Sequence, residues 1–62
     1  MIASMGYDAA TGILEIEFTK GGVVWQYFDV PEYVWNELLY SESQGKYWHA
    51  SIHKVYREVR VG

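Results

Sequence analysis

The chain has 62 residues, half of them hydrophobic, with no cysteine and a net charge of −3. A sequence of this length forms at most one domain, here residues 1–62, and buries only about 60% of its unfolded surface. The lack of cysteine excludes disulfides, thiolate metal sites and cysteine nucleophiles. Neither a membrane-length apolar run nor a secretory signal pattern is present, so we expect a cytoplasmic domain.

The first half of the sequence predicts a three-stranded antiparallel meander. Residues 2–7 form a short candidate strand, followed by a turn over residues 8–12. Residues 14–18 alternate apolar side chains with glutamates, the pattern of a strand with one buried face. A second turn over residues 19–22 leads to a strand over residues 23–29, which is rich in β-branched and aromatic residues. Both faces of this third strand are largely apolar, so we expect it to be central or covered on both sides.

The second half predicts two helices. Helical spacing runs from Glu32 to about Tyr40, after Val30-Pro31 has ended the sheet. Residues 41–45 break the pattern, and a second helix is predicted from about Lys46 to Val55. Alternation at the C-terminus favours a short added strand there. The predicted fold class is α+β, in the order β-β-β-α-α, with both helices packed on one face of the sheet. Apolar stripes are expected at Val34, Trp35, Leu38 and Leu39 of the first helix and at Trp48, Ile52, Val55 and Tyr56 around the second.

Short motifs lie in a defined order along nearly the whole chain. They are Gly6-Tyr7-Asp8, Thr11-Gly12, residues 14–18, Gly21-Gly22, Trp25-Gln26-Tyr27, Val30-Pro31, Ser43-x-Gly45, Tyr47-Trp48, Ile52 and Tyr56. Their order and spacing resemble the KTSC domain, a family named after the C-terminal extension of some lysyl-tRNA synthetases and also found as free-standing bacterial and phage proteins. Two histidines, His49 and His53, stand where that family usually has Asn and Arg. The resemblance implies no established activity, and the link to a tRNA-handling enzyme implies RNA binding.

Charge is divided unevenly between the two ends of the chain. Residues 1–45 carry one lysine against seven acidic residues, a net −6, whereas residues 46–62 carry four basic residues against one glutamate, a net +3. Cations beside aromatic rings can contact phosphates and stack on bases. We therefore predict a ligand-binding segment with Lys46, Lys54, Arg57 and Arg60 as phosphate contacts and Tyr47 and Trp48 as stacking rings.

Each of these features also has a purely structural interpretation. Trp48, Ile52 and Tyr56 have the spacing of core residues on a helix, and the cations would then be a solvated face. Trp25 and Tyr27 share one face of the third predicted strand. If exposed, they would be additional stacking rings, and if covered by a helix they would belong to the core.

Motifs for chemistry are lacking. His49 and His53 are four residues apart, but a metal site needs further ligands, and the zinc-protease pattern requires Glu where Ala50 stands. The serines lie in no nucleophile elbow, and Gly21-Gly22 lacks the signature of a phosphate loop. We therefore predict a non-enzymatic domain without metal or cofactor.

Two functions fit these observations. The first is a small binding module for RNA or a nucleotide-like, phosphate-bearing ligand, held by the basic and aromatic C-terminal segment. The alternative is a protein-interaction module that uses exposed aromatic side chains, with homo-oligomerisation as one form of it.

Overall fold

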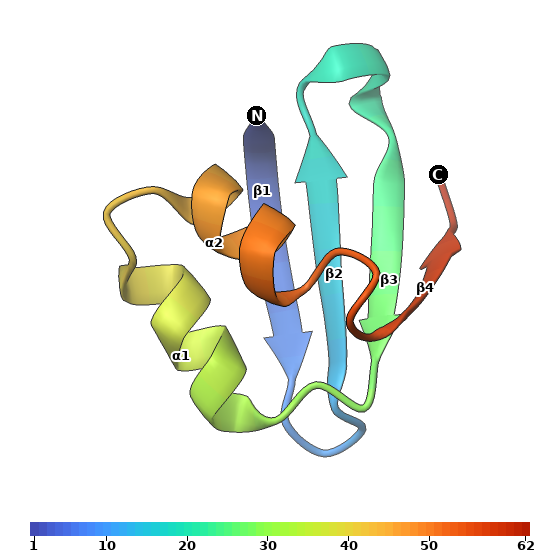
Figure 1. The fold of residues 1–62 in the computed structure, drawn as a ribbon. Coiled ribbons are helices and arrows are strands. Elements are labelled where there is room, and N and C mark those ends of the chain that lie inside the picture. The colour runs from blue at the N-terminus through green and yellow to red at the C-terminus, as the bar shows by residue number, and fades with distance from the viewer.

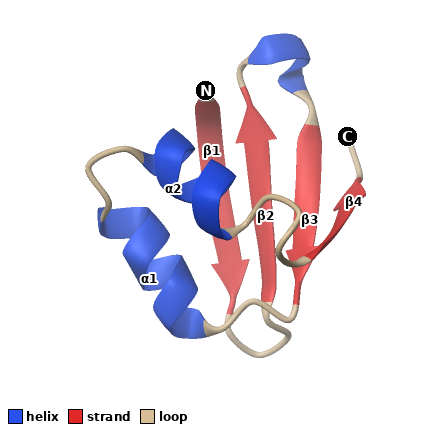
Figure 2. Cartoon of the chain, viewed as in Figure 1, coloured by secondary structure: helices blue, strands red, loops and turns tan.

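A four-stranded antiparallel sheet carries both helices on one face in the computed structural model, which describes all 62 residues (Figure 1). The sheet contains the strands in chain order, β1-β2-β3-β4, and the two helices lie between β3 and β4 in the sequence (Figure 2). The predicted α+β class is confirmed, including the short C-terminal strand. The elements are β1 (Ile2–Asp8), β2 (Ile13–Phe18), a short 3-10 turn (Lys20–Gly22), β3 (Val24–Phe28), α1 (Glu32–Tyr40), α2 (Gln44–Ser51) and β4 (Arg57–Arg60).

The turn between β1 and β2 depends on a glycine. Gly12 has a φ of 72°, a left-handed conformation that costs glycine little. Its amide donates to the Asp8 carbonyl at 2.8 Å, and its carbonyl accepts from the Val30 amide at 2.9 Å. The first turn is thereby fixed to the segment that leads from β3 into α1.

The two faces of the sheet differ because the strand register places apolar side chains opposite one another on one face and polar side chains opposite one another on the other. Leu14 of β2 lies opposite Tyr27 of β3, and both are completely buried beneath the helices. One residue further along each strand, Glu15 lies opposite Gln26 on the other face, where the two side chains are hydrogen-bonded at 3.0 Å. The third strand is central, as predicted, but only its helix-side face is covered.

The core joins the sheet to both helical segments. Val34 and Leu38 of α1 are buried, which confirms part of the predicted stripe, whereas Leu39 is exposed. Ile52, just after α2, completes the contact with the sheet. Neither helix reaches the length and apolarity needed to cross a membrane. The buried residues are Leu14, Ile16, Tyr27, Val30, Val34, Leu38 and Ile52.

The second helix begins and ends earlier than predicted. Residues 44 and 45 form its first turn instead of breaking the helix, because the Ser43 side chain caps it by accepting from the Lys46 amide at 3.3 Å. After Ser51 the chain tightens into turns, and Lys54 adopts a positive φ of 62°, which no continuing helix allows. Val55, predicted on the apolar face, is therefore exposed.

Candidate functional site

Aromatic side chains surround a cavity of about 180 Å³ on the helix-side face of the sheet. The walls come from β2, β3, α2, the turn after α2, and β4, so five segments meet there. We call this cavity the aromatic pocket. Its lining residues are Phe18, Trp25, Tyr27, Trp48, His53 and Glu58.

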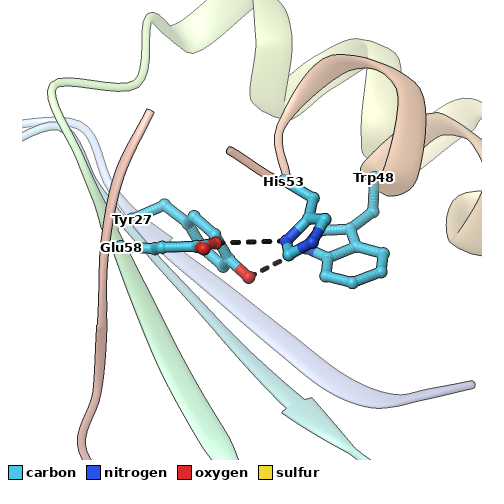
Figure 3. Close-up of polar contacts among 4 residues, drawn as sticks. All are labelled: Tyr27, Trp48, His53 and Glu58. Carbon is cyan, nitrogen blue, oxygen red and sulfur yellow. Dashed lines mark hydrogen bonds and ion pairs between the residues drawn. The ribbon is translucent and has the colours of Figure 1, made fainter. Parts of the chain in front are cut away.

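A partly buried hydrogen bond connects the sheet to α2 at this pocket. The Trp48 indole Nε1–H donates to the Tyr27 hydroxyl at 2.9 Å (Figure 3). Burial raises the pKa of the Tyr27 phenol above its usual value; the hydrogen bond from Trp48 opposes this shift, and the nearby Glu58 carboxylate adds to it. The phenol is therefore neutral at physiological pH, and it fixes the orientation of the indole.

A histidine and a glutamate form the polar end of the pocket. Nδ1 of His53 lies 3.3 Å from Oε1 of Glu58, with both side chains partly exposed (Figure 3). Glu58 is brought here by strand pairing, since it lies directly opposite Tyr27 in the β3–β4 register. The His53 ring also packs against Trp48, with ring centres 4.8 Å apart.

The remaining walls are apolar rings with partial exposure. Phe18 meets Trp48 edge to face, with ring centres 4.9 Å apart. Trp25 lies opposite Ile16 on one side and Arg60 on the other. A second cavity, of about 470 Å³, shares Phe18 and Trp48 with the aromatic pocket and extends the apolar surface toward Lys20. The two cavities therefore adjoin at the contact between Phe18 and Trp48.

Three of the predicted site residues meet in this pocket: Trp25, Tyr27 and Trp48. Tyr27 is completely buried and serves as its base, whereas the two indoles are only partly buried. Tyr47, predicted to stack on ligand, lies elsewhere: its hydroxyl donates to Glu37 at 2.7 Å and connects α2 to α1. Burial and this hydrogen bond raise the pKa of Tyr47 to about 12.

The four predicted phosphate contacts do not form one cluster. Lys46 is exposed on the first turn of α2, where it borders a different cavity, and Lys54 is exposed in the turn before β4. Arg57 and Arg60 lie on opposite faces of β4, because their spacing of three residues reverses the side. Arg57 lies over the Phe28 ring, 5.3 Å from its centre, on the face away from the helices. Arg60, beside Trp25, is on the pocket side.

Sequence reasoning missed three of the six pocket residues. Phe18 was assigned only to the strand pattern, and His53 only to a surface helix. Glu58 was noted only as the single acidic residue among the basic residues of the C-terminal segment. Its isolated negative charge is the one feature of the sequence that could have indicated a separate role for it. The His49 and His53 rings lie 5.9 Å apart, but no group of three or more potential ligands is present to hold a metal ion.

A small α+β domain with an aromatic pocket beneath its second helix is therefore defined by the fold and the site. The sequence pattern of the KTSC domain family matches residues 1–56. A protein from Tsukamurella paurometabola is 38% identical over 60 residues, which cover 97% of this chain and 88% of that protein. The crystal structure of a KTSC domain protein from Yersinia pestis aligns with a TM-score of 0.93 and 31% identity, over 98% of this chain and 84% of that one. This chain belongs to the KTSC domain family, as the sequence motifs indicated.

Proposed function

We propose that the protein is a non-enzymatic binding module for a phosphate-bearing aromatic ligand, either short single-stranded RNA or a nucleotide. The observation that carries this proposal is the convergence of Trp25, Trp48 and Phe18 around one open apolar cavity. A cytoplasmic location, where RNA and nucleotides occur, belongs to the same proposal.

The size of the pocket supports a ring-shaped ligand group. Small-molecule sites usually measure about 300–1,000 Å³, and the aromatic pocket, at about 180 Å³, is smaller. It has room for one planar ring, while the rest of the ligand would lie outside. Base stacking on aromatic side chains contributes about 1–3 kcal/mol per base and tolerates any base sequence.

Cations flank the pocket at two positions. Lys20 borders the adjoining cavity, and Arg60 pairs with Trp25 across the β3–β4 ladder. Phosphates attached to a ring in the pocket would meet these charges outside it. The phosphate contacts of the proposal are accordingly Lys20 and Arg60, whereas Arg57, on the other face of the sheet, is reassigned to packing on Phe28.

A protein partner is the second candidate function. It is favoured by a specific observation on α1, where Tyr33 and Tyr40 are 63% and 81% exposed. Tyrosines are enriched at protein interfaces, and neither side chain contributes to the core. This surface is separate from the aromatic pocket, so the two functions can be tested independently.

A fluorescence anisotropy titration tests the proposal. We would titrate a labelled, mixed-sequence single-stranded RNA at about 50 and about 200 mM salt, and we expect affinity to fall several-fold because phosphate contacts release counterions. Trp25→Ala should weaken binding about five- to a hundredfold through lost stacking. Tyr40→Ala, which removes an exposed ring outside the pocket, is the control and should bind as the wild type does.

A pair of arginine variants locates the phosphate contacts. Arg60→Gln should weaken binding and reduce its salt dependence, whereas Arg57→Gln, on the opposite face, should change neither. Absence of RNA binding at low salt would exclude the RNA form of the proposal. Normal binding by Trp25→Ala would exclude the pocket as the site.

A further inference from the structure

The polar side chains at one end of the aromatic pocket restrict which base it can accept. We infer that the pocket selects guanine, whose Watson–Crick edge would donate two hydrogen bonds to the Glu58 carboxylate. This inference rests on the proposed function and specifies its ligand. The stacking walls cannot supply such a preference, because every base has an aromatic face.

Glu58 is held in place from two sides. Its backbone is fixed opposite Tyr27 in the β3–β4 ladder, and its Oε1 atom is held by the His53 ring at 3.3 Å (Figure 3). The side chain is 22% exposed, so its charge is partly removed from water but still accessible at the cavity wall. An ionised carboxylate offers about four acceptor positions and no donor. The His53 ring occupies one of them and the Tyr27 hydroxyl, which interacts with the same carboxylate, a second, so acceptor capacity remains for a ligand.

The walls impose an orientation on the ligand. A base stacked on the Trp25 ring lies with its edge toward one of the remaining lining groups. The polar groups of the lining are the Glu58 carboxylate, the His53 ring, the Trp25 indole N–H and the Tyr27 hydroxyl, which accepts from Trp48. The end of the pocket near Glu58 therefore favours an edge rich in hydrogen-bond donors.

The four bases differ in what they present to a carboxylate. Guanine has adjacent N1–H and N2–H donors on its Watson–Crick edge, which match the two oxygens of a carboxylate. Adenine and cytosine present one donor beside an acceptor, and uracil presents a single N3–H between two carbonyls that the carboxylate would repel. Hydrogen bonds to a charged acceptor are about twice as strong as neutral ones. The expected order of affinity is guanine first and uracil last.

Charge also separates the base from its phosphate. Glu58 repels a phosphate group at the polar end of the pocket, whereas Lys20 and Arg60 attract it outside. A guanine nucleotide would thus bind with its base inward. A free phosphate or a triphosphate tail has no comparable place beside Glu58.

Mononucleotides test this inference directly. Quenching of tryptophan fluorescence reports occupancy, because Trp25 and Trp48 line the pocket. We expect GMP to bind most tightly among GMP, AMP, CMP and UMP. IMP is the matched ligand, since it lacks only the N2 amino group of GMP. Losing one member of a bidentate pair should weaken IMP about five- to a hundredfold relative to GMP.

A variant assigns the preference to the carboxylate. Glu58→Gln preserves the shape of the side chain but replaces one acceptor by a donor. The affinity of this variant for GMP should therefore fall to the affinity of the wild-type protein for IMP. Glu15→Gln, on the opposite sheet face, removes the same charge and should keep the preference. The comparison of GMP with IMP on the wild-type protein decides the question even if Glu58→Gln fails to fold.

The outcomes separate the inference from the proposed function. If all mononucleotides quench equally, or AMP binds best, guanine selection is overturned while nucleotide binding stands. If RNA binds in the anisotropy titration but no mononucleotide quenches, guanine selection is likewise overturned. If neither RNA nor any mononucleotide binds, the proposed function fails, and the inference fails with it.

Discussion

The two helices cover the same face of the sheet, but they fill the space beneath them differently. α1 buries Val34 and Leu38 completely or nearly so, and its Trp35 stacks on Tyr7 of β1 with ring centres 5.7 Å apart. α2 buries no residue of its own and leaves the aromatic pocket open between itself and β4. We refer to α1 with the part of the sheet beneath it as the packed half, and to α2, β4 and the aromatic pocket between them as the open half.

This difference indicates how a short chain can combine stability with a cavity. In the packed half, burial of apolar side chains joins α1 to the sheet. The open half keeps its shape through directed contacts, namely the Trp48–Tyr27 hydrogen bond and the edge-to-face contact of Phe18 with Trp48. Protein interiors pack densely, so flexible side chains would tend to fill a cavity that no directed contact holds open.

The packed half should account for the largest loss of stability. Leu38→Ala removes a completely buried side chain, and such substitutions typically cost about 2–5 kcal/mol in the free energy of unfolding. Urea denaturation followed by circular dichroism measures this loss. Val55→Ala, at a position 61% exposed, is the control and should change stability by less than about 0.5 kcal/mol. A loss below about 1 kcal/mol for Leu38→Ala would contradict tight packing under α1.

Loss of the hydrogen bond that joins α2 to the sheet in the open half should have an intermediate effect on the free energy of unfolding. Tyr27→Phe leaves the partly buried Trp48 indole N–H without its partner, and we expect a cost of about 1–3 kcal/mol. The same urea experiment applies, with Tyr33→Phe on the exposed side of α1 as the matched control. Equal stability of the two variants would mean that the hydrogen bond does not hold the open half together.

The open half should tolerate a smaller ring at its wall. Trp25→Phe enlarges an existing, partly exposed cavity instead of creating a sealed one, so we expect a loss of about 1 kcal/mol or less. Thermal unfolding measures it. A loss of about 3 kcal/mol, as expected for a closed core, would remove the distinction between the two halves.

Alkaline pH tests the contact between the two helices. The pKa of Tyr47 is raised to about 12 by burial and then by its hydrogen bond to Glu37, so the folded state favours the neutral phenol. This contribution to stability is complete below about pH 10, the unfolded value, and is lost as the pH rises through about 12.

Phenolate absorbance during an alkaline titration measures this shift. Glu37→Gln should lower the pKa of Tyr47 partway toward 10, because burial remains after the carboxylate is gone. An unchanged titration in this variant would show that Glu37 has no influence on Tyr47.

Local patterns were sufficient to predict most of the fold. The alternation over residues 14–18 fixed β2, and Pro31 followed by helical spacing fixed α1. The start of α2 was misplaced because Gly45 was interpreted as a breaker, although the cap at Ser43 places it in a first helical turn. The end was misplaced because Val55 continues an apolar spacing that the positive φ of Lys54 interrupts.

The candidate site was predictable only in part. Trp25 and Tyr27 share a strand face by periodicity, and Trp48 stands out as an aromatic residue. That Glu58 faces Tyr27 depends on the β3–β4 register, which is set by the length of the turns after α2. Inserting or deleting one residue in these turns would shift the register and turn Arg57 or Val59 toward the pocket in place of Glu58. No local pattern encodes such a register, so the polar end of the pocket could not be derived from the sequence.

The position of β4 has a consequence for how the molecule moves. This strand has four residues, is the last in the sheet and is paired only with β3. Edge segments with few partners detach at a lower free-energy cost than global unfolding, and amide hydrogen exchange detects such opening. We expect amides of β4 to exchange faster than those of β2. Because β4 carries Glu58, each such detachment would widen the pocket while the other three strands stay joined.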